Sequence, residues 1–228
     1  MRARIDLADQ RGTTLVEMLV ALASGLVVLS ALMALVLTTL HGSARVTARV
    51  HATERARIVL TRMMEELHSS CIMPEIAPIQ KASTGNSLEF VHQIGSAVAP
   101  TPIISVISFS GGTLSQQDYN ATGASPSWTR SSAIGGPLTL LTSVSPTSPS
   151  SSIFSYYRYS GGTISTTPLA TPLESEAALT VEVRAALTAA PETTPVKDAN
   201  ASASVQNSAT LRLTPPSFNE GSPARPCQ

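Results

Sequence analysis

The stretch Arg11-Gly12-Thr13-Thr14-Leu15-Val16-Glu17-Met18-Leu19 lies where a polar N-terminal segment gives way to a long apolar run. The run extends from Thr13 to Leu40, and Glu17 is its one ionisable residue. As a helix it would measure about 42 Å at roughly 1.5 Å per residue, whereas the hydrocarbon core of a bilayer measures about 30 Å. The sequence therefore predicts a membrane-spanning helix over residues 13–40, with one carboxylate near its start.

The helix is predicted to continue beyond the apolar run, because residues 43–73 contain neither proline nor glycine. Pro74 predicts its end, since the residue before a proline avoids helical geometry. Apolar side chains recur in this second part at three- and four-residue intervals, with one longer gap, and indicate one buried face. The predicted face consists of Val46, Val50, Leu60, Met64, Leu67 and Cys71, widened by Ala56, Val59 and Met63. Residues 41–73 are therefore expected to form the amphipathic half of the same helix.

Residues 74–228 have the pattern of a β-rich domain, with short apolar segments between Ser-, Thr-, Gly- and Pro-rich stretches. The predicted strands cover residues 87–94, 103–109, 138–144, 153–159, 178–187 and 209–213. The pairs Gly111-Gly112 and Gly161-Gly162 predict hairpin turns, because tight hairpins need positive φ. Residues 115–136 and 189–208 are expected to be long loops. The predicted fold class is α+β, with a long N-terminal helix packed through its second half on an antiparallel sheet.

The composition excludes several functional classes. Charged residues are only 13% of the 228, and the formal net charge is zero, so the chain as a whole exerts no electrostatic attraction for nucleic acid. No Cys-x-x-Cys, His-Glu-x-x-His, Gly-x-Ser-x-Gly or phosphate-binding glycine loop occurs. His41, His51 and His68 are expected to be solvated side chains of the helix rather than metal ligands. The sequence thus indicates no enzyme, no metal site and no cofactor.

The two cysteines, Cys71 and Cys227, leave two alternatives. If residues 74–228 are exported, the cysteines could form one disulfide, as expected in an oxidising compartment. They could equally remain two unpaired thiols, because Cys227 is next to the C-terminus.

The apolar run differs from a secretory signal peptide. It is longer than an h-region of roughly 7–15 residues, and no small-residue cleavage site follows it. Arginines flank both of its ends, so the positive-inside rule alone does not orient the helix. Gly12 instead lies before the run and closes a short basic segment, residues 1–12.

The segment Gly12-Thr13-Thr14-Leu15-Val16-Glu17, with its basic leader and apolar helix, resembles the prepilin-type signal of type IV pilins and pseudopilins. The resemblance implies a leader peptide over residues 1–12, cleavage between Gly12 and Thr13 by a prepilin peptidase, and N-methylation of Thr13 by the same enzyme. This sequence departs from the family pattern in having Thr13 where phenylalanine is common. The resemblance further implies an N-terminus on the cytoplasmic side, an exported C-terminal domain, and assembly with other pilin or pseudopilin subunits into a pilus or pseudopilus.

A physical argument leads to the same role for Glu17. A carboxylate within a bilayer costs roughly 2.5–3.5 kcal/mol on insertion scales, and such residues are candidates for function. Cleavage would give Thr13 a positive amine, and staggered parallel helices could bring that amine to Glu17 of a neighbouring subunit. Two simpler interpretations remain open: a position of Glu17 among lipid headgroups, and an interaction of Glu17 with the dipole of the helix N-terminus.

The subfamily and the alternatives rest on weaker patterns. The amphipathic helix ending in Met63-Met64-Glu65-Glu66-Leu67, with strand-like segments 154–159 and 211–213, is similar to minor pilins and pseudopilins of the W and J types. A single-pass membrane protein with an exported binding domain is the alternative function. The arginines of residues 45–62 could contact lipid headgroups or DNA, and a solvated helix face is the simpler interpretation.

Overall fold

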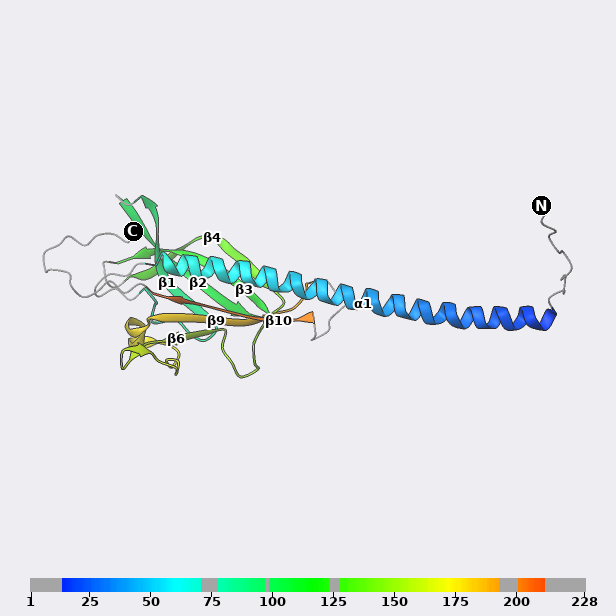
Figure 1. The fold of residues 1–228 in the computed structure, drawn as a ribbon. Helices are drawn as coiled ribbons and strands as arrows, with labels where there is room; N and C mark the ends of the chain where they lie inside the picture. The colour runs from blue at the N-terminus through cyan, green and yellow to red at the C-terminus, as the bar shows by residue number, and fades with distance from the viewer. Residues whose placement is uncertain (1–13, 71–77, 97–98, 124–127, 193–200, 212–228) are drawn as a thin grey trace, which may run out of the picture. The chain divides into compact units, whose positions relative to one another are not determined.

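The computed structural model describes residues 14–70, 78–96, 99–123, 128–192 and 201–211, and the chain divides into two compact units, Met1–Val46 and Thr47–Gln228. Its one long helix, α1 (Leu15–His68), has 54 residues and passes through the boundary between the units (Figure 1). The expected α+β fold with a long N-terminal helix and antiparallel sheets is confirmed. Helical structure continues through Gly42. The predicted end at Met73 was wrong by five residues: the helix ends at His68, because Ser69 lies in a turn and Ser70 pairs with His92 in an isolated β-bridge.

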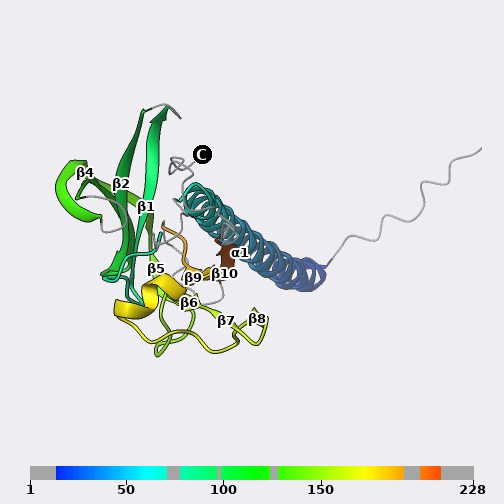
Figure 2. The same ribbon diagram turned by 90° about the vertical axis from the view of Figure 1, so that its left-hand side faces the viewer.

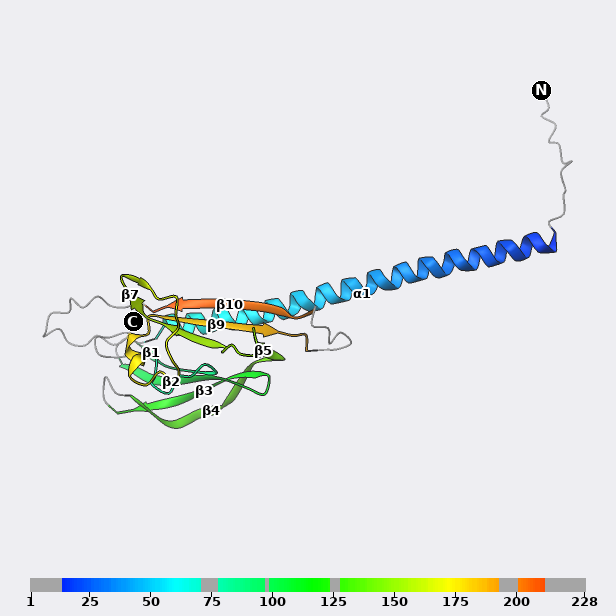
Figure 3. The same cartoon turned by 90° about the horizontal axis from the view of Figure 1, so that it is seen from below.

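The second unit contains two main sheets, which form separate layers in Figure 3. The first has the strand order β1-β2-β3-β4, and each neighbouring pair is antiparallel. Its strands are β1 (Ser87–Ser96), β2 (Ala99–Ser110), β3 (Thr113–Thr122) and β4 (Thr129–Thr142). In the second sheet β9 (Glu182–Ala189) pairs with β10 (Ala203–Thr210) on one side and with β5 (Val144–Pro146) and β6 (Phe154–Tyr157) on the other. The small hairpin of β7 (Tyr159–Ser160) and β8 (Thr163–Ile164) and the 3₁₀ helix η1 (Glu174–Leu179) complete the described elements (Figure 2).

Both glycine pairs form the predicted hairpin turns. Gly111 and Gly112 join β2 to β3 with φ of 55° and 80°, directly beside the pair Ser110 and Thr113. Gly161 and Gly162 join β7 to β8 with φ of 61° and 83°. Two successive residues with positive φ make the type I′ turn, whose twist matches that of paired strands.

The hydrophobic core lies between α1 and the two sheets. The side chains of α1 in this core recur at intervals of three and four residues along one face of the helix. They are Ala52, Ala56, Leu60, Met63, Met64 and Leu67. The sheets contribute large side chains such as Phe90, Ile107, Phe154 and Tyr156. Small residues along the first turns of this face let the helix approach the sheets closely, and larger residues fill the later turns.

The predicted helix face was wrong at its beginning. Val46 and Val50 are 64% and 47% exposed, whereas Ala52 and Ala56 are fully buried. Val50 lies two residues before Ala52, and at about 100° per residue it therefore points to the other side of the helix. Ala56 was part of the predicted face, whereas the buried residue at its beginning is Ala52 rather than Val46 or Val50.

Both predicted long loops were also wrong in part. Most of residues 115–136 belongs to β3 and β4, and the end of 189–208 belongs to β10. Residues Ser115, Gln116, Gln117 and Asp118 carry polar side chains on both faces of β3, so no apolar alternation marks the strand. It forms because β2 and β4 pair with its two edges. The last strand begins at Ala203, earlier than the predicted 209, for the same reason.

Candidate functional site

The N-terminus of α1 is capped by Thr14. The Thr14 carbonyl accepts a hydrogen bond from Met18 N at 3.1 Å, and its Oγ1 accepts one from Glu17 N at 3.3 Å. Thr14-Leu15-Val16-Glu17 therefore has the Thr-x-x-Glu spacing of a capping box, with Thr14 as the N-cap. Helix formation thus places Glu17 in the first turn of α1.

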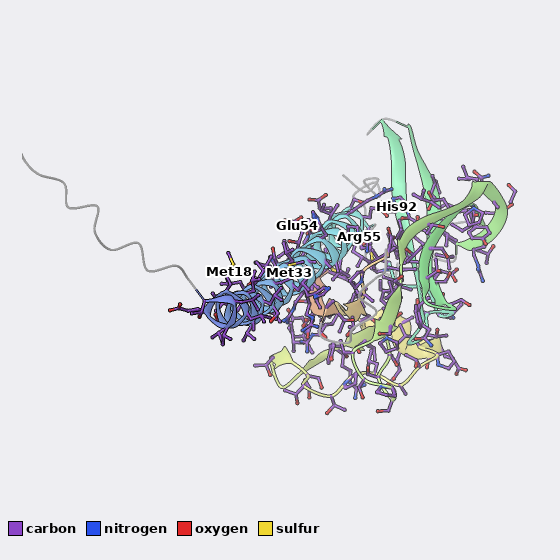
Figure 4. All side chains as sticks on the ribbon, turned by 90° about the vertical axis from the view of Figure 1, so that its right-hand side faces the viewer. Met18, Met33, Glu54, Arg55 and His92 are labelled. Carbon is purple, nitrogen blue, oxygen red and sulfur yellow. The ribbon has the colours of Figure 1, made fainter. Side chains whose placement is uncertain are left out.

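Glu17 is exposed in the structure, and no residue within the described ranges forms an ion pair with it. Its neighbours along the helix include the apolar residues Val16, Met18 and Val20, of which Met18 is labelled in Figure 4. A carboxylate in such surroundings can accept a charge-assisted hydrogen bond from a cation supplied by another molecule. Gly12 and Thr13, the predicted cleavage and methylation sites, lie outside the described residues.

The apolar side chains of the first unit have no partners within the described chain. From Leu15 to Leu40 the large hydrophobic residues are 43–77% exposed. Over this part α1 is long and apolar enough to span a membrane, and it is the one such helix among the described residues. A continuous exposed apolar surface of this length requires lipid or other protein chains around it.

A polar network, formed by Glu66, Gln116, Asp118, Ser105 and His92, connects the end of α1 to the first sheet. Gln116 Nε2 donates to Glu66 Oε2 at 2.9 Å and to Asp118 Oδ1 at 3.2 Å. Ser105 Oγ donates to Asp118 Oδ1 at 2.5 Å, and His92 Nε2 lies 2.8 Å from the same Ser105 Oγ. Since the hydroxyl gives its single proton to Asp118, His92 is the donor in the second bond.

The polar network combines serine, histidine and aspartate, but its order is wrong for a nucleophile. In a hydrolytic triad the histidine lies between the serine and the acid, whereas here Ser105 lies between His92 and Asp118. Ser105 is also completely buried, so a substrate cannot reach its hydroxyl. The polar network therefore serves to hold the helix in register with β1, β2 and β3.

The polar network should make stability depend on pH. Burial lowers the pKa of His92 from 6.5, and the carboxylates of Glu66 and Asp118 oppose this shift. Because the folded-state pKa lies below the unfolded-state value, the contribution of neutral His92 is complete above about pH 6.5 and is lost as the pH falls through the lowered pKa. We expect stability to fall between pH 7.5 and 5.5, by at most about 1.4 kcal/mol per pH unit for one proton.

Urea unfolding at both pH values would measure this effect, with His92→Gln as the comparison. The variant should lose less stability on acidification than the native chain. An equal loss in both would contradict a role for His92. Burial raises the pKa of Glu89, although Arg130 Nε lies 3.2 Å from Glu89 Oε1 and opposes this shift. Glu89 is present in the native chain and in the variant, so its contribution to the pH dependence of stability cancels when the two are compared.

A second polar contact joins α1 to the end of β9. Arg55 pairs with Glu192 and donates from Nη2 to the Ala190 carbonyl at 3.3 Å, and Thr142 hydrogen bonds to Glu192 as well. The hydrogen bonds from Thr142 and Arg55 lower the pKa of the Glu192 carboxyl. Figure 4 labels Arg55 on the helix and His92 on the first sheet, so the helix is tied by polar contacts to both sheets.

Sequence reasoning did not find the polar network. Polar side chains that face a core are the signal for such a network, but their orientation depends on strand register, and the sequence predicts a loop over residues 115–136, which include most of β3. Cys71 and Cys227 lie outside the described residues. Within the described ranges no group of three His, Cys, Asp or Glu side chains could hold a metal ion.

Comparisons with known proteins do not assign a family. No protein-family model matches the chain, and no curated protein matches its sequence.

Proposed function

We propose that the chain is the precursor of a membrane-anchored filament subunit similar to the minor type IV pilins and pseudopilins. The observation that carries the proposal is the position of Glu17 in the first turn of a capped helix, four residues after Thr13 in the sequence and at the start of an exposed apolar surface.

The proposed maturation begins with the leader, residues 1–12, on the cytoplasmic side of the membrane. A prepilin peptidase hydrolyses the Gly12-Thr13 peptide bond, which leaves an amine on Thr13, and the same enzyme methylates this amine. In the filament the amine of one subunit pairs with Glu17 of its neighbour, while the apolar residues 15–40 pack against other subunits. Pairing matters because an unpaired charge in an apolar surrounding is strongly destabilising.

A single-pass membrane anchor is the second candidate. The hydrogen bond from Glu17 N to Thr14 Oγ1 favours it, because a capping box by itself explains a glutamate at this position. In that case residues 1–12 stay attached, and the exported β-domain acts as a binding protein without assembly.

Processing of the N-terminus distinguishes the two candidates. We expect the mature chain to begin at Thr13, with or without one methyl group, when it is isolated from cells that contain a prepilin peptidase. Intact-mass and N-terminal peptide mass spectrometry would measure this directly. Gly12→Asp is the control, since it should retain residues 1–12 by blocking the peptidase.

A native chain that still begins at Met1 in such cells would contradict the filament proposal. Cleavage of Gly12→Asp at the same bond would show that the processing is unrelated to this motif.

A further inference from the structure

A polar cavity of about 390 Å³ opens between α1 and β10 in the second unit. Thr53, Arg57 and Thr61 line it from the helix, and residues Ser204 to Asn207 line it from the strand. The buried side chain of Leu60 also borders the cavity. The two elements lie side by side in Figures 1 and 3. A cavity of this size with several convergent polar groups is in the range of ligand-binding sites.

One side of the cavity is the free edge of β10. β10 is the last strand of its sheet, and β9 is the strand that pairs with it among the described residues. Ala186 N donates to the Ile153 carbonyl, so the backbone of Ala186 faces away from β10. Its neighbours Ala185 and Leu187 then face β10, where they pair with Asn207 and Val205.

The backbone groups of the alternate residues must point the other way. Because the backbone groups of Val205 and Asn207 form hydrogen bonds with β9, the N–H and C=O groups of Ser204 and Gln206 point away from β9. Both of these residues line the cavity. Unpaired strand edges of this kind accept a further strand by main-chain hydrogen bonds.

The other side of the cavity supplies a positive charge. Arg57 is exposed, and no hydrogen bond, ion pair or aromatic contact of its side chain occurs with the described residues, in contrast to Arg55 and Arg62. The other polar side chains that line the cavity from the helix are those of Thr53 and Thr61, which carry hydroxyl groups. The lining therefore contains one cation and no carboxylate.

We propose that this cavity binds a short extended peptide segment that carries a carboxylate. The segment adds to the free edge of β10 through the backbone of Ser204 and Gln206, and its carboxylate pairs with Arg57. Charge complementarity selects an acidic segment, and the strand edge selects an extended one. The inference does not depend on filament assembly, because an anchored binding protein would use the same surface.

Fluorescence anisotropy with the full chain in detergent micelles would test the proposal. The probes are labelled peptides of the form acetyl-Thr-Val-Glu-Val-Thr-amide and the same peptide with glutamine in place of glutamate. We expect the glutamate peptide to bind at least about fivefold more tightly, since hydrogen bonds to charged groups are the stronger ones. Arg57→Gln should abolish this preference, whereas Arg49→Gln, which removes the same charge outside the cavity lining, should retain it.

Two methylated peptides test the strand geometry without changing the protein. One carries N-methyl groups on both valine amides, and the other on the glutamate and the last threonine amide. Since alternate amides of a strand point in opposite directions, one peptide should lose binding and the other should keep it.

Three results would overturn the proposal: no binding of the glutamate peptide, equal binding of the glutamate and glutamine peptides, or the same effect of both methylation patterns. Retention of the glutamate preference in Arg57→Gln would also overturn it, because the carboxylate would then lie elsewhere.

Discussion

Glu17→Ala is expected to leave removal of residues 1–12 largely intact and to lower incorporation of the chain into a filament at least about a hundredfold. In the maturation that we propose, the peptidase acts at the Gly12-Thr13 bond, whereas Glu17 acts after cleavage as the partner of the new amine. Breaking a buried ion pair by removing one partner costs about 3–5 kcal/mol, and each 1.4 kcal/mol changes an equilibrium about tenfold. The measurement is the amount of mature chain in purified filaments relative to the membrane fraction.

Glu54→Ala is the matched control for this prediction. Glu54 is an exposed carboxylate on the same helix, and its one described ion-pair contact is His51 at 3.8 Å. Its removal should change neither cleavage nor incorporation. Normal incorporation of Glu17→Ala would eliminate the pairing mechanism, and a loss of cleavage in the same variant would mean that Glu17 acts in recognition by the peptidase.

Leu60→Ala is expected to lower the free energy of unfolding of the second unit by about 2–5 kcal/mol. The side chain is 1% exposed and belongs to the core between α1 and the sheets, so its truncation leaves a cavity that the packed strands cannot close. Urea unfolding in micelles would measure the change, with the fluorescence of Trp128 as the signal. Trp128 is the residue immediately before β4 in the sequence. Trp128 is the one tryptophan of the chain.

Ile58→Ala is the control for the core prediction. Ile58 is on the same turn of α1 but is 69% exposed, so its truncation should change stability by less than about 0.5 kcal/mol. Equal losses in the two variants would mean that the packed face of the helix is different from the one described. A loss for Leu60→Ala below about 1 kcal/mol would contradict tight packing of the helix on the sheets.

The helix was predictable because its causes are local. The apolar run and the absence of proline act within one or a few turns, and they correctly predicted that α1 continues beyond Gly42, while the predicted start at residue 13 came two residues before Leu15. The glycine pairs were predictable for the same reason, since positive φ at two successive residues is a local requirement of the turn. Most apolar strand segments were also recognised at approximately their correct positions.

The remaining strands depended on distant partners. β3 is polar on both faces and exists because two neighbours offer hydrogen bonds, and most of β4 is exposed despite its length. The beginning of the packed face of α1 showed the same dependence, since the small side chain of Ala52 is buried there and the larger Val46 and Val50 are exposed.

By itself the sequence determined the long helix, its apolar first part, the position of Glu17 in its first turn and the two glycine turns. Only the tertiary structure decided where the buried helix face begins, that Glu66 reaches Gln116 across fifty positions of sequence, and that Arg57 faces the free edge of β10. The physical reason is the range of the interactions. Helix capping and turn conformation act between near neighbours, whereas a buried polar network or a cavity requires strand register, which is set by contacts between segments far apart in the chain.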